Sequence, residues 1–131
     1  MRERILAFLV LGLFAAAPTA CGVGAATDEE NVSKTATTYL RALAAGDTAK
    51  ACAQLTPRAK GRSCDTVMKE RLARLDPDAL TGAADASMDI NVDGNRATVG
   101  LSEPTGARFL LAKVGGEWRI DSGYTLGPGA S

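Results

Sequence analysis

Three cysteines are the residues of this chain whose type and spacing point most directly to chemistry. They stand at positions 21, 52 and 64 of a 131-residue chain that contains no histidine. A cysteine thiol can carry a lipid, pair as a disulfide, bind zinc or attack a substrate. Histidine is the commonest metal ligand and the usual base beside a nucleophilic cysteine, so its absence argues against the last two uses.

The first cysteine, Cys21, follows a segment with the parts of an export signal. Two arginines precede an uninterrupted apolar run from Ile5 to Ala17, and Pro18-Thr19-Ala20 leads into the cysteine. A charged start, an apolar run of about 7–15 residues and small residues before the cut mark a secretory signal peptide. The segment resembles a lipoprotein signal, in which the cysteine after the cut accepts a diacylglyceryl group and becomes the mature N-terminus.

We therefore expect a signal peptide over 1–20, a lipid on Cys21 and a short tether over 21–27. This would hold the domain on the extracytoplasmic face of the cell membrane. Two alternatives stay open. Ordinary cleavage after Ala25 would release a secreted protein. The uncharged stretch Ile5–Ala26 would instead remain as an anchor, since about 20 apolar residues span a bilayer, although its glycines and proline make it a poor spanning helix.

The other two cysteines, Cys52 and Cys64, are predicted to pair with each other. Once Cys21 is acylated or removed, two cysteines remain in an oxidising compartment, where pairing is the usual fate. Without histidine or further cysteines they would make a poor zinc site.

Two other groups of residues suggest chemistry more weakly. The run Asp89-x-Asn91-x-Asp93-Gly94 resembles the start of a calcium loop, but Gly100 stands where the loop needs a bidentate glutamate. We expect a hairpin turn there and no metal. The phenol of Tyr39, in an apolar pocket, could orient a substrate carbonyl. Catalysis would also need an acid or base beside it, but the carboxylates Asp89 and Asp121 are predicted to alternate to the opposite sheet face. We therefore predict no catalytic residue and no cofactor.

The charge balance excludes one class of partner. Fifteen basic residues face fifteen acidic ones, whereas nucleic-acid binders cluster Lys and Arg to neutralise phosphates. Residues 58–74 hold six basic residues against two acidic ones. Such a face can contact anionic headgroups, but we expect it to be simply solvated.

Hydrophobic periodicity predicts the elements that position these residues. Helical spacing indicates three helices, about 28–46, 47–55 and 63–75, with Asp76-Pro77-Asp78 ending the third. From Ala86 the period changes to two, which predicts a hairpin over 88–101 and strands over 107–114 and 117–124. Met88 and Trp118 fall on the sheet's apolar face. The tail 126–131 is rich in Gly, Pro and Ser and is expected to be flexible.

About three helices followed by a four-stranded antiparallel meander predict an α+β domain over 28–125. The segments YLRALAAGD and ACAQLTPRAK (within 39–60), VDGNRATVGL (92–101) and KVGGEWRID (113–121) resemble small exported lipoproteins of high-GC Gram-positive bacteria with the nuclear-transport-factor-two-like cone fold. That superfamily includes ketosteroid isomerase, polyketide cyclases and non-catalytic envelope modules. The resemblance implies the cone fold, and it places Tyr39 where the isomerases have a hydroxyl donor.

The expected function is a non-catalytic binding or interaction module at the cell envelope, anchored in the membrane through Cys21. Its partner would be an envelope protein or a small apolar ligand. The alternative is a carrier of such a ligand, or an isomerase-like or cyclase-like enzyme, using the cone interior with Tyr39, Trp118 and Met88 as pocket-lining residues. An open cavity of a few hundred Å³ would favour the alternative. We expect at most a small cavity, because the apolar side chains of the first helix and the sheet are mostly medium to large, and so short a chain has little surplus wall.

Overall fold

The computed structural model describes residues 26–102 and 107–123, which form five helices and a four-stranded sheet. The helices are α2 (Asp28–Ala44), α3 (Thr48–Ala53), α4 (Pro57–Lys60), α5 (Cys64–Leu72) and α6 (Pro77–Asp85). The strands are β1 (Met88–Asp93), β2 (Arg96–Leu101), β3 (Arg108–Val114) and β4 (Glu117–Gly123). The predicted signal peptide over 1–20, Cys21 and the tail 126–131 lie outside the described residues.

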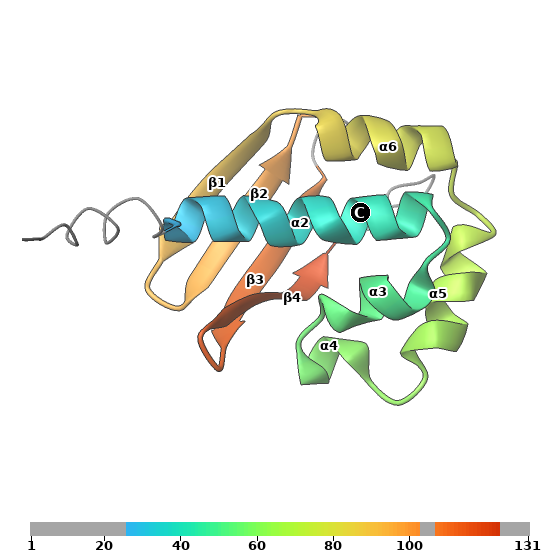
Figure 1. The fold of residues 1–131 in the computed structure, drawn as a ribbon, viewed down its shortest axis with the longest axis horizontal. Coiled ribbons are helices and arrows are strands. Elements are labelled where there is room, and N and C mark those ends of the chain that lie inside the picture. Colours follow the sequence, from blue (N-terminus) through green and yellow to red (C-terminus); the bar gives the residue numbers. More distant parts are fainter. Residues whose placement is uncertain (1–25, 103–106, 124–131) are drawn as a thin grey trace, which may run out of the picture.

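The sheet is antiparallel throughout, with the strands in the order β1-β2-β3-β4. Helix α2 crosses one face of it, α6 lies beside α2, and α3, α4 and α5 gather at one end of the molecule (Figure 1). This arrangement confirms the predicted α+β class, with helices packed on a four-stranded antiparallel sheet.

Helix α2 is specified by its first turn and by one apolar stripe. The hydroxyl of Thr27 accepts a hydrogen bond from the Glu30 N–H at 3.1 Å, and three acidic residues in the first turn complement the helix dipole. The helix ends before Gly46, whose φ of 75° suits glycine. The predicted stripe is buried against the sheet: Val32, Ala36, Tyr39, Leu40 and Leu43.

Two helices were not predicted, α4 and α6, and both begin with proline. The Asp76 carboxylate accepts from the Asp78 N–H, and Pro77 occupies the first turn of α6. Proline fits there because its missing N–H would have no helical partner. The prediction that Asp76-Pro77-Asp78 only ends a helix was therefore incomplete. Helix α6 buries Leu80, Ala83 and Ala84 and packs beside α2.

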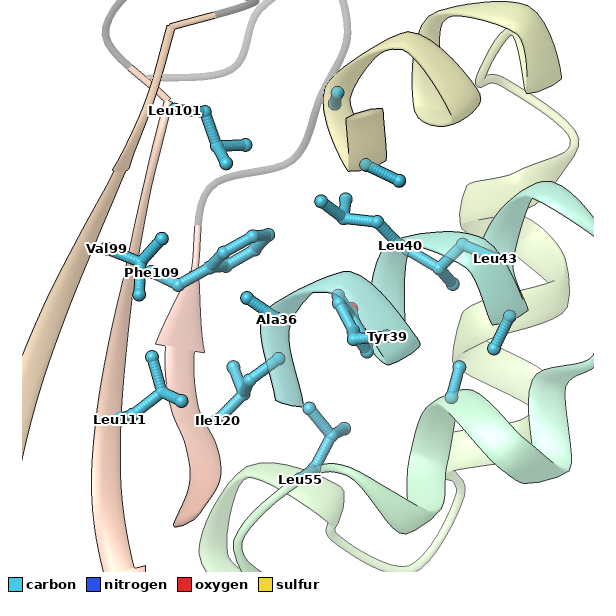
Figure 2. Close-up of a cluster of buried hydrophobic side chains, with 14 of the residues drawn as sticks. Ala36, Tyr39, Leu40, Leu43, Leu55, Val99, Leu101, Phe109, Leu111 and Ile120 are labelled. Atoms are coloured by element: carbon cyan, nitrogen blue, oxygen red, sulfur yellow. The ribbon is translucent and has the colours of Figure 1, made fainter. Parts of the chain in front are cut away.

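The strands follow the predicted alternation, and both tight turns contain glycine with positive φ. Gly94 (φ 62°) joins β1 to β2, so the calcium-like run is a hairpin, as predicted. The inward side chains of β2, β3 and β4 are buried: Ala97, Val99, Leu101, Phe109, Leu111, Trp118 and Ile120. Figure 2 shows the labelled members facing the apolar stripe of α2. On the edge strand β1, Met88, Ile90 and Val92 are only half-buried.

Candidate functional site

A cavity of about 550 Å³ lies at the end of the molecule where α3, α4 and α5 gather. Its inner wall is apolar and comes from α2, from the segment after α3 and from the sheet: Tyr39, Leu40, Leu43, Leu55, Phe109 and Ile120. Its outer wall runs from α4 through the connection to α5 and includes Ala59, Gly61 and Ser63.

The prediction of at most a small cavity is therefore wrong. Its basis was the size of the side chains on α2 and the sheet, and those do fill the interior where the two pack directly. The outer wall, however, carries exposed small residues at positions 59, 61 and 63, so no large side chain there closes the space over the apolar wall.

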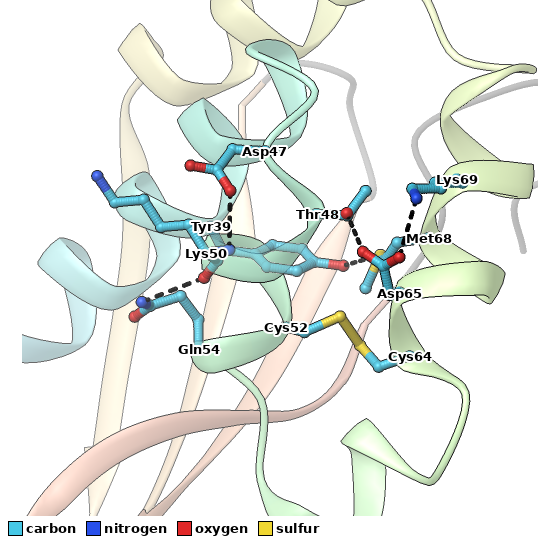
Figure 3. The surroundings of a disulfide bond; sticks show 10 residues. All are labelled: Tyr39, Asp47, Thr48, Lys50, Cys52, Gln54, Cys64, Asp65, Met68 and Lys69. Atoms are coloured by element: carbon cyan, nitrogen blue, oxygen red, sulfur yellow. Dashed lines mark hydrogen bonds and ion pairs between the residues drawn. A yellow bond between two sulfur atoms is a disulfide. The ribbon is translucent and has the colours of Figure 1, made fainter.

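Tyr39 is the predicted site residue that lines this cavity. Its side chain is 7% exposed, and its ring meets Phe109 edge-on with centroids 5.7 Å apart. The hydroxyl donates to the sulfur of Met68 at 3.8 Å, as Figure 3 shows. A thioether is a weak acceptor, so this contact satisfies the phenol poorly.

Burial raises the pKa of the Tyr39 phenol, and the positive charge of Arg71 partly opposes that rise. Because the ordinary value is already 10.0, the group is protonated at neutral pH. Tyr39 therefore offers a donor O–H to whatever enters the cavity.

The Cys52–Cys64 disulfide fixes the outer wall and confirms the predicted pairing. It joins α3 to the first residue of α5, with Cα atoms 6.1 Å apart. The α5 end of the connection that contains Gly61 and Ser63 is thereby tied to α3, as Figure 3 shows for the two sulfurs.

A polar cluster adds a second link between α3 and α5. The Thr48 hydroxyl donates to Asp65, and Lys69 forms an ion pair with the same carboxylate at 3.0 Å. These hydrogen bonds, first from Thr48 and then from Lys69, lower the pKa of Asp65. The carboxylate is therefore charged and already paired.

Asp121 lies on the rim of the cavity, on the sheet face that carries Arg96 and opposite the buried Ile120, as its alternation predicts. In the pairing of β3 with β4, Leu111 opposes Ile120 and Leu110 opposes Ser122, so Asp121 is the extra residue of a bulge. A bulge interrupts the two-residue alternation and turns the strand. The inward position after Ile120 is therefore Gly123, opposite Phe109, which the two-residue period does not predict.

The Asp121 carboxylate is held by the neighbouring segment. Thr56 donates to it at 2.9 Å, Arg58 forms an ion pair, and Arg96 lies 3.9 Å away. The hydrogen bond from Arg58, followed by that from Thr56, lowers the pKa of this carboxyl group. The backbone of the same segment pairs with β4, since the Thr56 N–H donates to the Ile120 carbonyl at 2.9 Å.

The basic stretch 58–74 is exposed, as expected, and three of its cations line the cavity: Lys60, Arg62 and Arg71. Within residues 26–102 and 107–123, none of the three forms an ion pair. The cavity thus joins an apolar interior to a rim with unpaired positive charge.

Trp118 and Met88 do not line this cavity, contrary to prediction. Trp118 is buried near the start of α2, where its Nε1 donates to Asp28 at 3.1 Å and Lys113 lies over the ring at 5.5 Å. Met88 is half-buried on β1 and accepts weakly from Ser33. Both share a sheet face with the cavity residues but lie elsewhere on it.

Sequence reasoning also missed residues that do line the cavity. Phe109 and Leu55 line the cavity, and their apolar type was the available signal. Arg71 lines it too, and its signal was its place in the basic stretch. What the sequence lacked was the position of α5 relative to the sheet.

Two other kinds of site are absent from the described residues. No group of three His, Cys, Asp or Glu side chains there is placed to hold a metal ion. Within the same ranges, no helix has the length and apolar character needed to cross a membrane. Comparison of the chain with protein-family models, curated proteins and solved structures gave no match.

Proposed function

We propose that this chain is a lipid-anchored extracytoplasmic module that binds a small apolar ligand without transforming it. The cavity beside Tyr39 carries the proposal. Its volume of about 550 Å³ falls within the 300–1,000 Å³ typical of small-molecule sites, and such sites combine apolar walls with a few polar groups. An interaction module that recognises proteins through a flat surface would have no need of this space.

The polar groups at the cavity suit binding better than catalysis. A general base works best when its pKa lies near the operating pH, but the pKa of Asp121 is lowered by Arg58 and Thr56. The pKa of Tyr39 is raised by burial, so its phenol is a hydrogen-bond donor rather than a base. The isomerase-like alternative would need one of these two groups to exchange protons near neutral pH.

The proposed setting at the membrane rests on residues 1–21 of the sequence. The described domain begins at Ala26, so a lipid on Cys21 would hold it close to the bilayer. We also propose that the domain belongs among the nuclear-transport-factor-two-like proteins, a proposal supported by its order of elements and by the sequence motifs within 39–60, 92–101 and 113–121.

Ligand binding is tested with radiolabelled decanol, a neutral apolar probe, by equilibrium dialysis. The full chain is held in lipid nanodiscs, and empty nanodiscs measure the probe taken up by lipid. Protein should retain decanol above that background. Val67→Trp should weaken binding about ten-fold or more, since displacing two or more methylene contacts at about 0.8 kcal/mol each exceeds 1.4 kcal/mol.

Val114→Trp is the matched control. Val67 and Val114 are 42% and 41% exposed, but only Val67 lines the cavity. The control should therefore bind decanol as the parent does. Equal binding by both variants, or no binding above empty nanodiscs, would refute the cavity as a ligand site.

The anchor is tested separately with Cys21→Ser. This variant should appear in the medium or accumulate as uncleaved precursor. Unchanged partition into membranes together with unchanged cleavage would contradict lipidation at Cys21.

A further inference from the structure

The distribution of charge around the cavity says more about the ligand than its volume does. Lys60, Arg62 and Arg71 line the cavity, and they come from three successive parts of the outer wall: the end of α4, the connection and α5. The acidic residue that also lines the cavity is Asp121. Formal charge at the rim is therefore positive.

The nearby carboxylates do not neutralise these three cations. Asp121 is engaged by Thr56 and Arg58, with Arg96 at 3.9 Å. Asp65, on the first turn of α5, is engaged by Thr48 and Lys69. Among the described residues, the three cations at the cavity thus remain without a carboxylate partner, although Asp65 lies close in the sequence and Asp121 lines the same cavity.

The Tyr39 hydroxyl supplies a second, independent indication. The side chain is more than nine-tenths buried, and its donor reaches only a methionine sulfur among the described residues. Buried hydroxyl groups normally have a stronger partner. The positive charge of Arg71 also acts on this phenol, so a cation and an under-used donor lie on the same part of the wall.

We propose that the cavity binds a small amphiphile whose anionic oxyacid head, a carboxylate or a phosphate monoester, lies between Arg71 and the Tyr39 hydroxyl. The apolar body of the ligand contacts Leu40, Leu43 and Phe109. Arginine and a hydroxyl donor suit this head, because guanidinium binds carboxylate and phosphate through paired N–H groups. Lys60 and Arg62 add positive potential at the entrance.

This inference rests on the proposed function and names its ligand class. The test compares four probes of one chain length on the nanodisc-held full chain: decanoate, decyl phosphate, decanol and decylamine. Decanoate or decyl phosphate should bind at least about ten-fold more tightly than decanol, in line with the strength of charge-assisted hydrogen bonds. Decylamine should bind most weakly, because its charge matches that of the rim.

Arg71→Gln should remove most of the preference for the anionic probes, weakening their binding by a larger factor than that of decanol. Arg74→Gln is the matched control, since Arg74 is an exposed neighbour that does not line the cavity. Tyr39→Phe should weaken anion binding by a smaller factor, with folding checked by circular dichroism. The anion that depends more strongly on Arg71 identifies the head as carboxylate or phosphate.

The outcomes separate this inference from the proposed function. If decanol and both anions bind with equal affinity in the parent and in Arg71→Gln, the anionic class is wrong but the cavity still binds apolar ligands. Tighter binding of decylamine than of decanoate also overturns the class. If no probe binds above empty nanodiscs, the proposed function itself fails.

Discussion

The two ends of the interior are built in opposite ways. Where α2 lies on the middle of the sheet, Val32, Ala36, Val99 and Leu111 are almost completely buried. Where α4 and α5 extend past β4, buried apolar side chains of α2 and the sheet form one wall of a cavity, and small or exposed side chains form the other. Dense packing stabilises the fold through contacts between side chains. An unfilled space loses those contacts, but it can hold a ligand. The comparison therefore separates residues that hold the domain together from residues that define a site.

The largest difference between the two ends should appear on truncating apolar side chains. Leu111→Ala removes a fully buried side chain from the packed end, so it should lower the free energy of unfolding by about 2–5 kcal/mol. Val67→Ala at the cavity should cost less than about 1 kcal/mol, because Val67 is already exposed. Urea unfolding measures both, and similar losses for the two variants would contradict the distinction.

Removing the disulfide should affect the cavity end next most strongly. The Cys52→Ala/Cys64→Ala double variant should lose about 3 kcal/mol of stability, because the open loop has more freedom when unfolded. Retention of decanol should fall too, since the α5 end of the outer wall is no longer tied to α3. Reduction of the parent protein should reproduce both changes, and a double variant that binds and unfolds like the parent would refute this role.

A glycine at the junction between the two ends provides a sharper test. A Cβ atom on Gly123 would lie 2.3 Å from Cδ1 and 2.8 Å from Cε1 of Phe109, which is itself buried. Gly123→Ala should therefore cost about 1–3 kcal/mol through overpacking.

Gly82→Ala is the control for that substitution and should act in the opposite direction. Gly82 lies inside α6, and a Cβ atom added to it would meet no other atom within 4 Å. Alanine there should stabilise the domain by about 0.5–1 kcal/mol. Equal effects of the two substitutions on thermal unfolding would show that contact with Phe109 is unimportant.

The smallest expected effect is a pH dependence at the cavity rim. The pKa of Asp121 is lower in the folded protein than its ordinary value, so its contribution to stability is present above about pH 4 and is lost as pH falls through the folded pKa. Arg58 is largely exposed, so the effect should be below about 1 kcal/mol. Asp121→Asn and Arg58→Gln should each reduce the acid-induced loss of stability, measured by urea unfolding. Unchanged acid profiles in both variants would contradict this assignment.

Sequence periodicity predicted those helices and strands whose start, end and buried face are specified by nearby residues. Helix α2 has a capped start, an apolar stripe and a terminating glycine, and the β1–β2 hairpin has its turn residues in place. Helix α6 was missed because Asp76-Pro77 was interpreted only as a stop, although the same dipeptide caps and starts a helix. The disulfide was predictable because two cysteines remained after Cys21 was assigned to the lipid.

The site was less predictable, because it depends on contacts between distant segments. The bulge at Asp121 shifts the alternation of the residues that follow it, so Gly123 opposes Phe109, and no feature of the two-residue pattern indicates it. The pairing of residues 54–56 with Ile120 places α4 and its connection to α5 at the rim, across more than sixty positions of sequence. Trp118 and Met88 were predicted correctly to share the apolar face of the sheet. The sequence did not show how far along that face they lie from the cavity.

The disulfide also determines when the outer wall of the cavity is complete and the protein can bind its proposed ligand. The connection with Gly61, Arg62 and Ser63 lies inside the loop that Cys52 and Cys64 close. In the reducing cytoplasm that loop would stay open, so a chain waiting for export would lack a finished outer wall. In the proposed setting, the wall is completed only outside the cytoplasm. Such a protein cannot carry a cytoplasmic cargo out with it: its ligand must be met on the far side of the membrane, after the thiols have oxidised.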